Sequence, residues 1–282
     1  FIDNFVRFLE IPFKKVVSQR LKLSEIWIYP IKSLGGIRLP AAKVMEKGLE
    51  HDRRWMLIDA NNTFLTQRTH HAMALFKLSI EACCFRIHHF SESISLPFTN
   101  EVLPEPISAK IWDDAVTVLE VNAELSHWFS KQLGIVCRLV QFPETNPRLI
   151  DEDYRIGNAS VSLADGFPFL IIGQSSLNDL NQRLPQSLPM NRFRPNLVFA
   201  GGNPYEEDGW RNFLIGKNRF VGVKPCSRCV LTTIDQQTAA AGKEPLATLA
   251  TYRKKDNKIY FGQNAIAIDY EEIFEGDEIT IS

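Results

Sequence analysis

The stretch RFVGVKPCSRCVLTTI, residues 219–234, places two cysteines between two runs of strand-type residues. RFVGV and CVLTTI are short and rich in branched apolar residues, a composition typical of β-strands. Runs of the same type recur along the chain at EIWIYPI (25–31), RWMLIDA (54–60), AVTVLEV (115–121), KIYFG (258–262) and DEITIS (277–282). The sequence therefore predicts a mainly β protein with a few helices (α+β), organised as barrels or sandwiches.

Helical and turn patterns are fewer. AELSHWFSKQLG (123–134) brings its large apolar residues to one face and ends in glycine, which indicates a helix. SSLNDLNQRL (175–184) begins with a cap-type serine and repeats leucine at helical spacing, which indicates a second helix. DANN (59–62) and KKDN (254–257) are typical of hairpin turns.

Length, composition and charge restrict the kinds of protein this chain can be. Its 282 residues are 45% hydrophobic and 23% charged, which is typical of a globular protein with one large or two ordinary domains. The formal net charge of −1 argues against a general role in nucleic-acid binding. No stretch approaches the roughly 18 uninterrupted apolar residues of a membrane span, so we expect none.

Proline and acidic residues gather in FPETNPRLIDED (142–153), which we interpret as the seam between two mainly β halves. We therefore expect an N-terminal domain over residues 23–143 and a C-terminal domain over residues 144–282. Residues 1–22 mix apolar and basic groups and predict a helical extension packed on the protein body. A helix that contacts a membrane surface or a partner protein is the alternative.

The five cysteines are odd in number and too few for a disulfide framework in a chain of this size, which favours a reducing, cytoplasmic setting. Cys226 and Cys229 admit several interpretations. A structural zinc site is disfavoured because there is no second CxxC and all six histidines lie far upstream. A dithiol-exchange pair is disfavoured because a strand-type run, not a helix, is expected after Cys229. A buried structural cysteine stays open, and so does a single working thiolate, which the charges of Lys224 and Arg228 favour.

Basic and hydrogen-bonding residues recur at the predicted strand ends. Taken singly, each is typical of a solvated surface charge. Taken together, they suit a phosphate-bearing ligand with many hydrogen-bonding groups. The residues are Lys32 and Ser33 in YPIKS, Arg53 and Arg54 in HDRRW, Arg68 in FLTQR, and Arg194 and Asn196 in FRPN.

These segments, taken in order, resemble the MOSC superfamily, in particular the YcbX type that is related to the mitochondrial amidoxime-reducing component. FRPN, PCSRC and FGQN in this order make the resemblance specific, whereas each alone is weak. The matching pieces run collinearly from about residue 24 to residue 281. They are YPIKSLGG (29–36), DRRWMLID (52–59), FLTQR (64–68), SLADGFPFLI (162–171), FRPNLVF (193–199), EEDGW (206–210), KPCSRCVLTTID (224–235), EPLATL (244–249) and FGQNAIA (261–267).

The resemblance implies an N-terminal MOSC β-barrel domain and a C-terminal MOSC β-barrel domain that hold a molybdenum cofactor (Mo-molybdopterin) between them. It implies that Cys229 is the molybdenum ligand and the catalytic residue, with Cys226 as a neighbour. Gly166 and Phe167 stand where relatives carry Thr-Ser, so only backbone contacts carry over there, and Asn264 stands where some relatives have tyrosine. The other implied cofactor contacts are Lys32, Ser33, Arg53, Arg194, Asn196, Ser227 and Arg228.

The implied reaction is reduction of the N–O bond in a small N-hydroxylated substrate, with the oxygen released as water. Asp235, Asn264 and His51 are candidates for protonation, and nothing in the sequence singles one out. Electrons are expected from a ferredoxin-like domain with a 2Fe-2S cluster or from a separate reductase, because this chain has no cluster motif. Its start at Phe1 and abrupt end at Ser282 lead us to expect a piece of a longer bacterial protein.

Two further implications accompany the resemblance. MOSC domains also end the sulfurase that modifies this cofactor, so a non-catalytic cofactor-binding or sulfur-carrier module is the alternative function. The superfamily also carries a pyridoxal phosphate-binding label.

Overall fold

The computed structural model describes residues 20–99 and 102–282. The helical extension predicted for residues 1–22 lies outside the described residues except for residues 20–22. These three are not helical, because residues 20 and 21 have no regular structure and Lys22 begins the first strand. Nineteen strands, three α-helices and four short 3-10 helices are present in the described residues. The predicted mainly β fold with few helices is thus confirmed.

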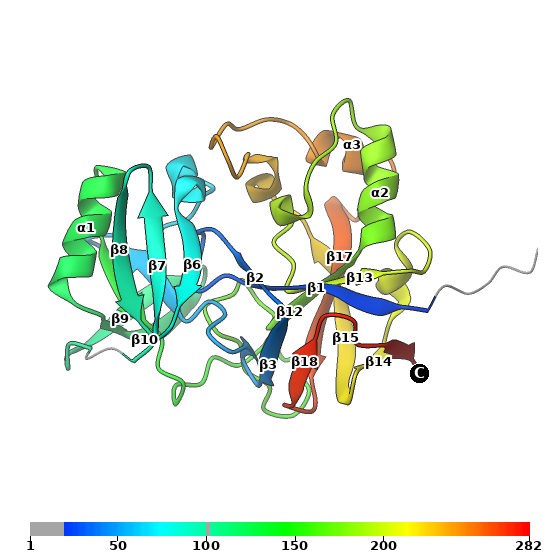
Figure 1. Cartoon of the computed structure of the whole chain (residues 1–282), viewed down its shortest axis with the longest axis horizontal. Coiled ribbons are helices and arrows are strands. Elements are labelled where there is room, and N and C mark those ends of the chain that lie inside the picture. Colours follow the sequence, from blue (N-terminus) through cyan, green and yellow to red (C-terminus); the bar gives the residue numbers. More distant parts are fainter. Residues whose placement is uncertain (1–19, 100–101) are drawn as a thin grey trace, which may run out of the picture.

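The largest sheet contains nine strands: β1 (Lys22–Ile28), β2 (Ile37–Leu39), β12 (Phe169–Gly173), β13 (Leu197–Ala200), β14 (Asn212–Ile215), β15 (Asn218–Ser227), β16 (Lys254–Lys255), β17 (Lys258–Ala267) and β19 (Ile279–Ile281). Their order is β19-β14-β15-β17-β12-β13-β1-β2, with β16 beside β17. All its pairings are antiparallel except that of β12 with β13. This sheet forms most of the right-hand half of the molecule (Figure 1).

Three smaller sheets complete the fold. One has the order β5 (Trp55–Ile58), β11 (Arg138–Gln141), β10 (Asp114–Glu120) and β9 (Pro106–Ile111). A meander follows the order β6 (Lys77–Glu81), β7 (Cys84–His89) and β8 (Glu92–Pro97). The third joins β18 (Glu272–Phe274), β3 (Ala41–Met45) and β4 (Gly48–Leu49).

The helices follow local sequence rules in part. The α-helices are α1 (Ala123–Leu133), α2 (Gln174–Arg183) and α3 (Leu246–Ala250), and the 3-10 helices are η1 (His71–Leu75), η2 (Met190–Arg192), η3 (Glu206–Gly209) and η4 (Val230–Thr233). The prediction for α1 is confirmed: Asn122 caps its first turn by accepting from the Leu125 N–H, and Gly134 ends it at φ 68°.

The serine cap predicted for α2 is wrong. The helix begins at Gln174, one residue earlier, and its N-cap residue Gly173 has no capping side chain. The buried carboxylate of Glu207, on η3, accepts hydrogen bonds from the Gly173 N–H at 3.1 Å and the Ser176 hydroxyl at 2.9 Å. A residue distant in sequence therefore satisfies donors at this helix end.

The strand predicted over CVLTTI (229–234) is also wrong. β15 ends at Ser227, and residues 230–233 form η4. The Thr232 hydroxyl donates to the Cys229 carbonyl at 2.9 Å, and the Thr233 hydroxyl donates to the Val230 carbonyl at 2.8 Å. Local threonine-to-backbone bonds of this kind compete with the ladder bonds of a sheet.

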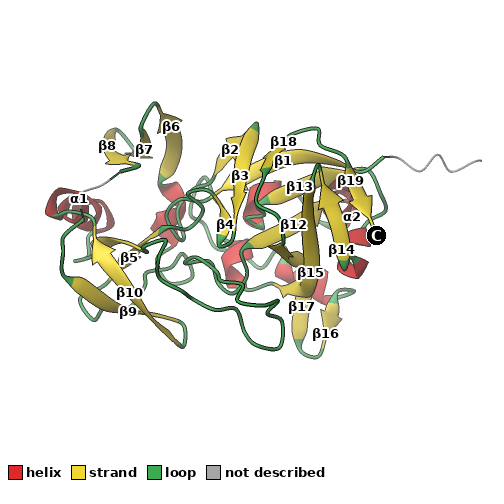
Figure 2. Ribbon diagram, turned by 90° about the horizontal axis from the view of Figure 1, so that it is seen from below, coloured by secondary structure: helices red, strands yellow, loops and turns green. Residues whose placement is uncertain are grey.

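The strand pairing crosses the boundary between residues 143 and 144 that the composition predicts. β1 and β2 come early in the sequence but belong to the large sheet, where β1 pairs with β13 (Figure 1). β3 pairs with β18 near the end of the chain. The proline-rich segment lies within residues 142–168, which link β11 to β12 as a long loop. Figure 2 shows long loops between the two groups of strands.

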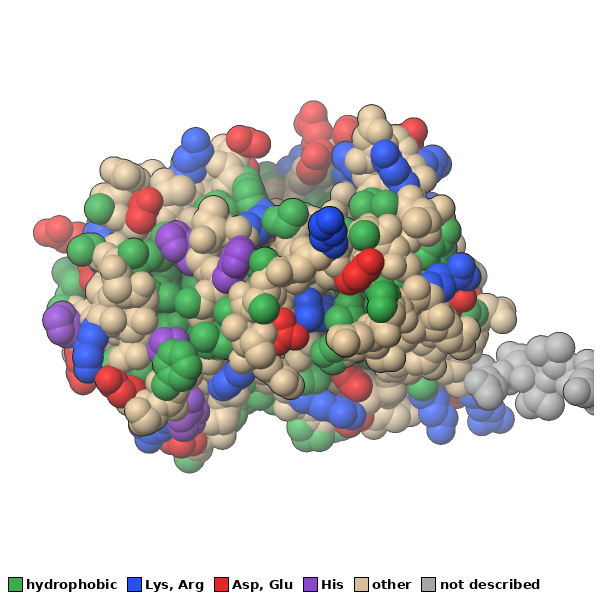
Figure 3. All heavy atoms as spheres, turned by 90° about the horizontal axis from the view of Figure 1, so that it is seen from above, with side chains coloured by type: hydrophobic (Ala, Val, Ile, Leu, Met, Phe, Trp, Pro, Cys, Tyr) green, Lys and Arg blue, Asp and Glu red, His purple; other side chains and the backbone are tan. Residues whose placement is uncertain are grey.

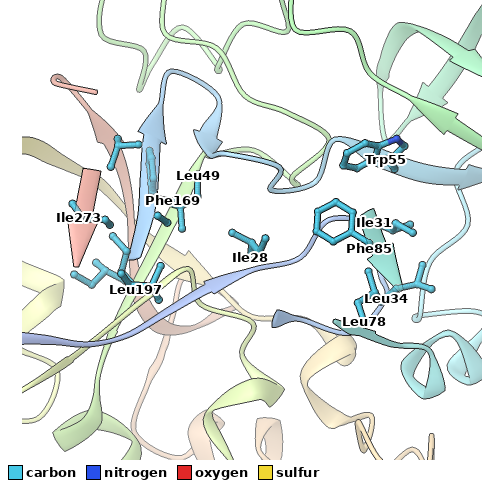
Figure 4. Close-up of a cluster of buried hydrophobic side chains, with 14 of the residues drawn as sticks. Ile28, Ile31, Leu34, Leu49, Trp55, Leu78, Phe85, Phe169, Leu197 and Ile273 are labelled. Atoms are coloured by element: carbon cyan, nitrogen blue, oxygen red, sulfur yellow. The ribbon is translucent and has the colours of Figure 1, made fainter. Parts of the chain in front are cut away.

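A single hydrophobic cluster connects the two halves (Figure 4). Ile28 lies between a group that includes Phe169 and Leu197 of the large sheet and a group that includes Trp55 and Phe85. All five side chains are at most 1% exposed. Because the halves share one core, the loops between them are anchored on both sides.

Candidate functional site

A cavity of about 320 Å³ opens where loops of both halves meet. All eleven residues predicted to contact a cofactor line this cavity, although they come from six separate segments of the chain. They are Lys32, Ser33, Arg53, Gly166, Phe167, Arg194, Asn196, Ser227, Arg228, Cys229 and Asn264. Their convergence is a structural finding, and their binding roles stay predictions.

Three of these residues adopt backbone conformations that are unusual for side chains larger than glycine. Ser33 has φ 67°, Arg53 has φ 49° and Arg194 has φ 54°. Left-handed conformations of non-glycine residues are uncommon and are concentrated at functional sites. The fold therefore maintains strained backbone at three separate points of one cavity wall.

Two arginines stack on the ring of Tyr29. The guanidinium carbon of Arg53 lies 4.3 Å from the ring centroid and that of Arg194 lies 4.2 Å from it. The tyrosine is fixed in turn, since its hydroxyl donates to the Pro195 carbonyl at 3.1 Å. Each guanidinium group is attracted to the face of this ring, which stabilises its position in the cavity wall.

Burial shifts the pKa values of Arg194 and Tyr29 without changing their charge at neutral pH. Desolvation lowers the pKa of Arg194 to about 10, and it raises the pKa of Tyr29 to about 12. The arginine therefore stays cationic and the tyrosine stays neutral at pH 7. Asp52 balances one charge, because its carboxylate pairs with the Arg53 guanidinium at 2.7 Å.

Asn196 connects this arginine pair to the large sheet. Its side-chain oxygen accepts from Arg53 at 3.1 Å, and its side-chain nitrogen donates to the Trp27 carbonyl at 3.2 Å. Its backbone N–H donates to the Leu170 carbonyl at 2.9 Å. The asparagine thus positions Arg53 rather than standing free in the cavity.

The pairing of β15 with β17 becomes irregular where the PCSRC segment forms part of the cavity wall. The register of β15 against β17 shifts between Gly222 and Lys224, and again between Pro225 and Ser227. Such bulges redirect side chains away from the normal alternation of a strand. Cys229 then stands, half-buried, immediately before η4.

Each cysteine of the pair contacts a different arginine. The Arg68 Nε lies 3.2 Å from the Cys229 sulfur, and the Arg228 Nη1 lies 2.9 Å from the Cys226 sulfur. Both cysteines are free thiols. Each sulfur therefore has a cationic hydrogen-bond donor beside it.

Arg68 connects Cys229 to a network of charges. Its Nη2 donates to Asp165 at 3.0 Å, and the same carboxylate accepts from the buried ammonium of Lys32 at 2.5 Å. Desolvation opposes ionisation of Asp165, but the charges of Lys32 and Arg68 outweigh it and hold the pKa of Asp165 below its usual range. Burial itself lowers the pKa of Lys32, while Asp165 acts in the opposite direction.

Positive charge dominates the lining. Within the described residues the cavity wall carries a single acid, Asp165. Six cationic side chains line the same cavity: Lys32, Arg53, Arg68, Arg194, Lys224 and Arg228. An enclosed excess of lysine and arginine is suited to an anionic ligand such as a phosphate.

Sequence reasoning assigned no cofactor contact to three charged residues that line the cavity: Arg68, Lys224 and Asp165. Arg68 was grouped with the basic residues that suit a phosphate-bearing ligand, and Lys224 was considered only for its charge beside the cysteines. Asp165 lies in SLADGFPFLI, directly before Gly166, but was not singled out, and Trp112 donates to it from outside the cavity lining. Two considered residues lie elsewhere: His51 stacks on Phe98, with centroids 4.8 Å apart, and Asp235 pairs with Arg192 at 2.8 Å.

The structure does not favour a zinc site at the cysteine pair. The six histidines all belong to residues 51–127, and those visible in Figure 3 lie over the N-terminal half. Over residues 20–99 and 102–282, no three His, Cys, Asp or Glu side chains gather as metal ligands. Across the same ranges, none of the helices combines the length and hydropathy needed to span a membrane.

Comparisons with known proteins identify two family domains in this chain. Residues 20–135 match the MOSC N-terminal beta barrel domain, and residues 158–280 match the MOSC domain. The chain is 32% identical to mitochondrial amidoxime-reducing component 1 of Mus musculus, over 83% of this chain and 72% of that protein. It is 34% identical to mitochondrial amidoxime reducing component 2 of Rattus norvegicus, over 87% of this chain and 76% of that protein.

A second group of relatives is larger. The chain is 32% identical to the molybdenum cofactor sulfurase of Oryza sativa subsp. japonica, over 99% of this chain but only 36% of that protein. It thus spans about a third of this sulfurase. With both family domains matched in order, and with relatives above 30% identity over most of their length, this chain belongs to the MOSC family.

Proposed function

We propose that this chain is a molybdenum cofactor-dependent oxidoreductase module that reduces the N–O bond of small N-hydroxylated compounds, with Cys229 as the protein ligand to molybdenum. One observation carries the proposal. A thiol hydrogen-bonded to an arginine shares one cavity with six cationic side chains. A soft metal ligand and an anion-binding wall are the two features that a metal-bound pterin phosphate requires. The names of the mammalian relatives give the reaction class.

The described residues fit such a group. The Nε of Arg228 is buried and has no hydrogen-bond partner among residues 20–99 and 102–282, although the same side chain lines the cavity. Buried donors in native proteins are normally satisfied, so this one favours a ligand oxygen nearby. Arg53, Arg194 and Lys224 would hold the anionic tail, and Ser33 and Ser227 would add hydrogen bonds.

The cofactor, when bound, supplies the two-electron chemistry. The residues of this chain would position the cofactor and supply the positive charge that surrounds it. Arg68 donates to the Cys229 sulfur at 3.2 Å and so fixes its direction, while Asp165 holds Arg68 in place at 3.0 Å. Tyr29 holds the guanidinium groups of Arg53 and Arg194 in the cavity wall through cation–π contacts. In the overall reaction, N–O cleavage consumes two electrons and two protons and yields the reduced nitrogen compound and water.

The electron donor belongs to the same proposal. An external two-electron supply is required, from a reductase or from a ferredoxin-like domain with a 2Fe-2S cluster. A cytoplasmic bacterial location is consistent with the five free thiols.

The test is turnover of benzamidoxime by the cofactor-loaded chain, with reduced methyl viologen as electron donor. Benzamidine is expected from the wild type. Cys229→Ala is expected to reduce the rate at least a hundredfold and to lower molybdenum content measured by mass spectrometry. Cys226→Ala distinguishes the two thiols of the motif. Cys84→Ala, at the start of β7 and outside the cavity lining, serves as the matched control. Full turnover by Cys229→Ala would refute the assignment of the ligand.

One observation favours the alternative of a non-catalytic cofactor-binding or sulfur-carrier module. The match to the rice sulfurase covers 99% of this chain, more than either match to an amidoxime-reducing component quoted above. The same experiment separates the two functions. The alternative is supported if the chain retains the cofactor tightly but forms no benzamidine under conditions in which a known reductase of the family is active.

A further inference from the structure

A second cavity, of about 540 Å³, lies apart from the site described above. Among the described residues, none lines both cavities. The second cavity reaches Ile28, the buried residue that lies between the two groups of core side chains in Figure 4. Both halves contribute to its lining, since Leu39 belongs to the large sheet whereas Ile80 belongs to the β6–β8 meander and Phe98 follows it. A cavity of this volume can hold a small organic molecule.

Much of the apolar surface in this second cavity is aromatic. The rings of His51 and Phe98 stack with centroids 4.8 Å apart, and Phe98 contacts the buried ring of Phe85 edge-on, also at 4.8 Å. His51 is held in the left-handed backbone region at φ 65°, which is uncommon for a residue other than glycine. Tyr270 adds a ring that is 49% exposed. The fold therefore presents fixed aromatic surface to a molecule in this cavity.

The polar part of the lining is acidic. Glu50, Glu271 and Glu272 line the second cavity together with Lys43, which lies directly opposite Glu272 in the pairing of β3 with β18. In the part of the chain that the structure describes, none of these three glutamates forms an ion pair. Burial lowers the pKa of His51, so its ring stays neutral at pH 7 and adds no positive charge. Three carboxylates against one ammonium group leave an excess of negative charge.

These features select the kind of molecule that suits the second cavity. An anion is repelled by the carboxylates, and a neutral apolar molecule would cover them without giving them a partner. A cation is attracted both to the carboxylates and to the faces of aromatic rings. The apolar lining favours a ligand with a flat hydrocarbon part, because burying that part removes apolar surface from water.

We propose that the second cavity binds a small organic cation with a flat apolar body, such as an aryl-alkyl ammonium compound. The charged group lies at the carboxylates of Glu50, Glu271 and Glu272. The flat body packs against Tyr270 and the stacked rings of His51 and Phe98. This inference goes beyond the proposed function and does not depend on it, because the two cavities are lined by different residues.

Two probes with the same phenyl ring test the selection of charge. Isothermal titration of the full chain should show binding of 2-phenylethylammonium at one site and binding of neutral 2-phenylethanol that is at least tenfold weaker. Replacing Glu50 and Glu271 together with glutamine should weaken the ammonium probe about tenfold, since each exposed ion pair contributes modestly, and should leave the alcohol unchanged. Glu124→Gln, at an exposed position of α1 outside both cavities, is the matched control and should bind both probes as the wild type does.

Two further variants locate the bound probe. Tyr270→Ala should weaken both probes about fivefold, and Tyr270→Phe should retain most of the affinity. Asp165→Asn removes the acid that lines the first cavity and should leave the affinity for the ammonium probe unchanged.

Several results would overturn the inference. They are equal affinities for the two probes, no measurable binding of the ammonium probe, full affinity in the double glutamine variant, and loss of affinity in Asp165→Asn. Sedimentation velocity tests the other occupant of such a surface, a second copy of this chain. A dimer that Tyr270→Asp dissociates would assign the second cavity to contact between copies and would also overturn the inference.

Discussion

Replacing Glu207 with glutamine is expected to stabilise the protein above pH 7 and to remove part of its pH dependence. The Glu207 side chain is 0% exposed and accepts hydrogen bonds from the Gly173 N–H and the Ser176 hydroxyl at the start of α2. Burial raises the pKa of Glu207 to about 7 from its ordinary value of 4.5, and these hydrogen bonds offset only part of that rise. The folded protein therefore holds the proton more tightly than the unfolded chain does.

The sign and size follow from proton linkage. Because the folded pKa is the higher one, the contribution of Glu207 to the free energy of unfolding is fully present below about pH 4.5 and is lost as the pH rises to about 7. The gap between the two pKa values corresponds to about 3 kcal/mol, at ~1.4 kcal/mol per pH unit. Glutamine keeps a carbonyl acceptor for the Gly173 N–H and does not ionise.

The assay is urea unfolding of wild type and Glu207→Gln at intervals from pH 4.5 to pH 8.5. The difference between the two free energies of unfolding isolates this one group, since all other titrating residues are shared. It should grow in favour of the variant by about 3 kcal/mol across that range. Glu206→Gln, at the half-buried neighbouring position, is the control and should run parallel to wild type. A constant difference between Glu207→Gln and wild type would refute the assigned proton affinity.

Two further outcomes are expected. Tyr29→Leu should lower the molybdenum content of the purified protein at least fivefold, because it removes the ring on which Arg53 and Arg194 stack. Tyr29→Phe should retain most of the metal, and equal metal content in both variants would contradict this role. Ile28→Ala should cost about 2–5 kcal/mol and keep a single unfolding transition, because Ile28 packs in the core shared by the two halves. Separate transitions by tryptophan fluorescence and circular dichroism would show that the halves unfold independently.

Much of the fold could be predicted because it depends on local pattern. The strand-type runs gave the mainly β class, and the helix over residues 123–134 was predicted almost to the residue, since its cap and terminal glycine lie next to it in sequence. CVLTTI failed because branched residues favour strands only on average. The hydroxyls of Thr232 and Thr233 make local bonds that the pattern does not reveal.

Part of the candidate site could also be predicted from the sequence, and part could not. Residues within recognisable motifs, such as Arg194 in FRPN and Cys229 in PCSRC, could be assigned to one cavity from sequence. The contact between Trp112 and Asp165 could not be predicted, because it depends on how a hairpin turn of one half is placed against a loop of the other. Long-range contacts between single side chains leave no periodic trace in the sequence.

The early position of β1 in the large sheet has a consequence for dividing this protein. A truncated chain starting at residue 144 would lack β1 and β2, and the β13 backbone that β1 now covers would become an unprotected rim. Rims of this kind recruit other chains and promote aggregation. The shorter chain would also lack Lys32 and Arg53, which line the cavity. A cut at the proline-rich segment would therefore remove the first strand of the large sheet and part of the cavity wall.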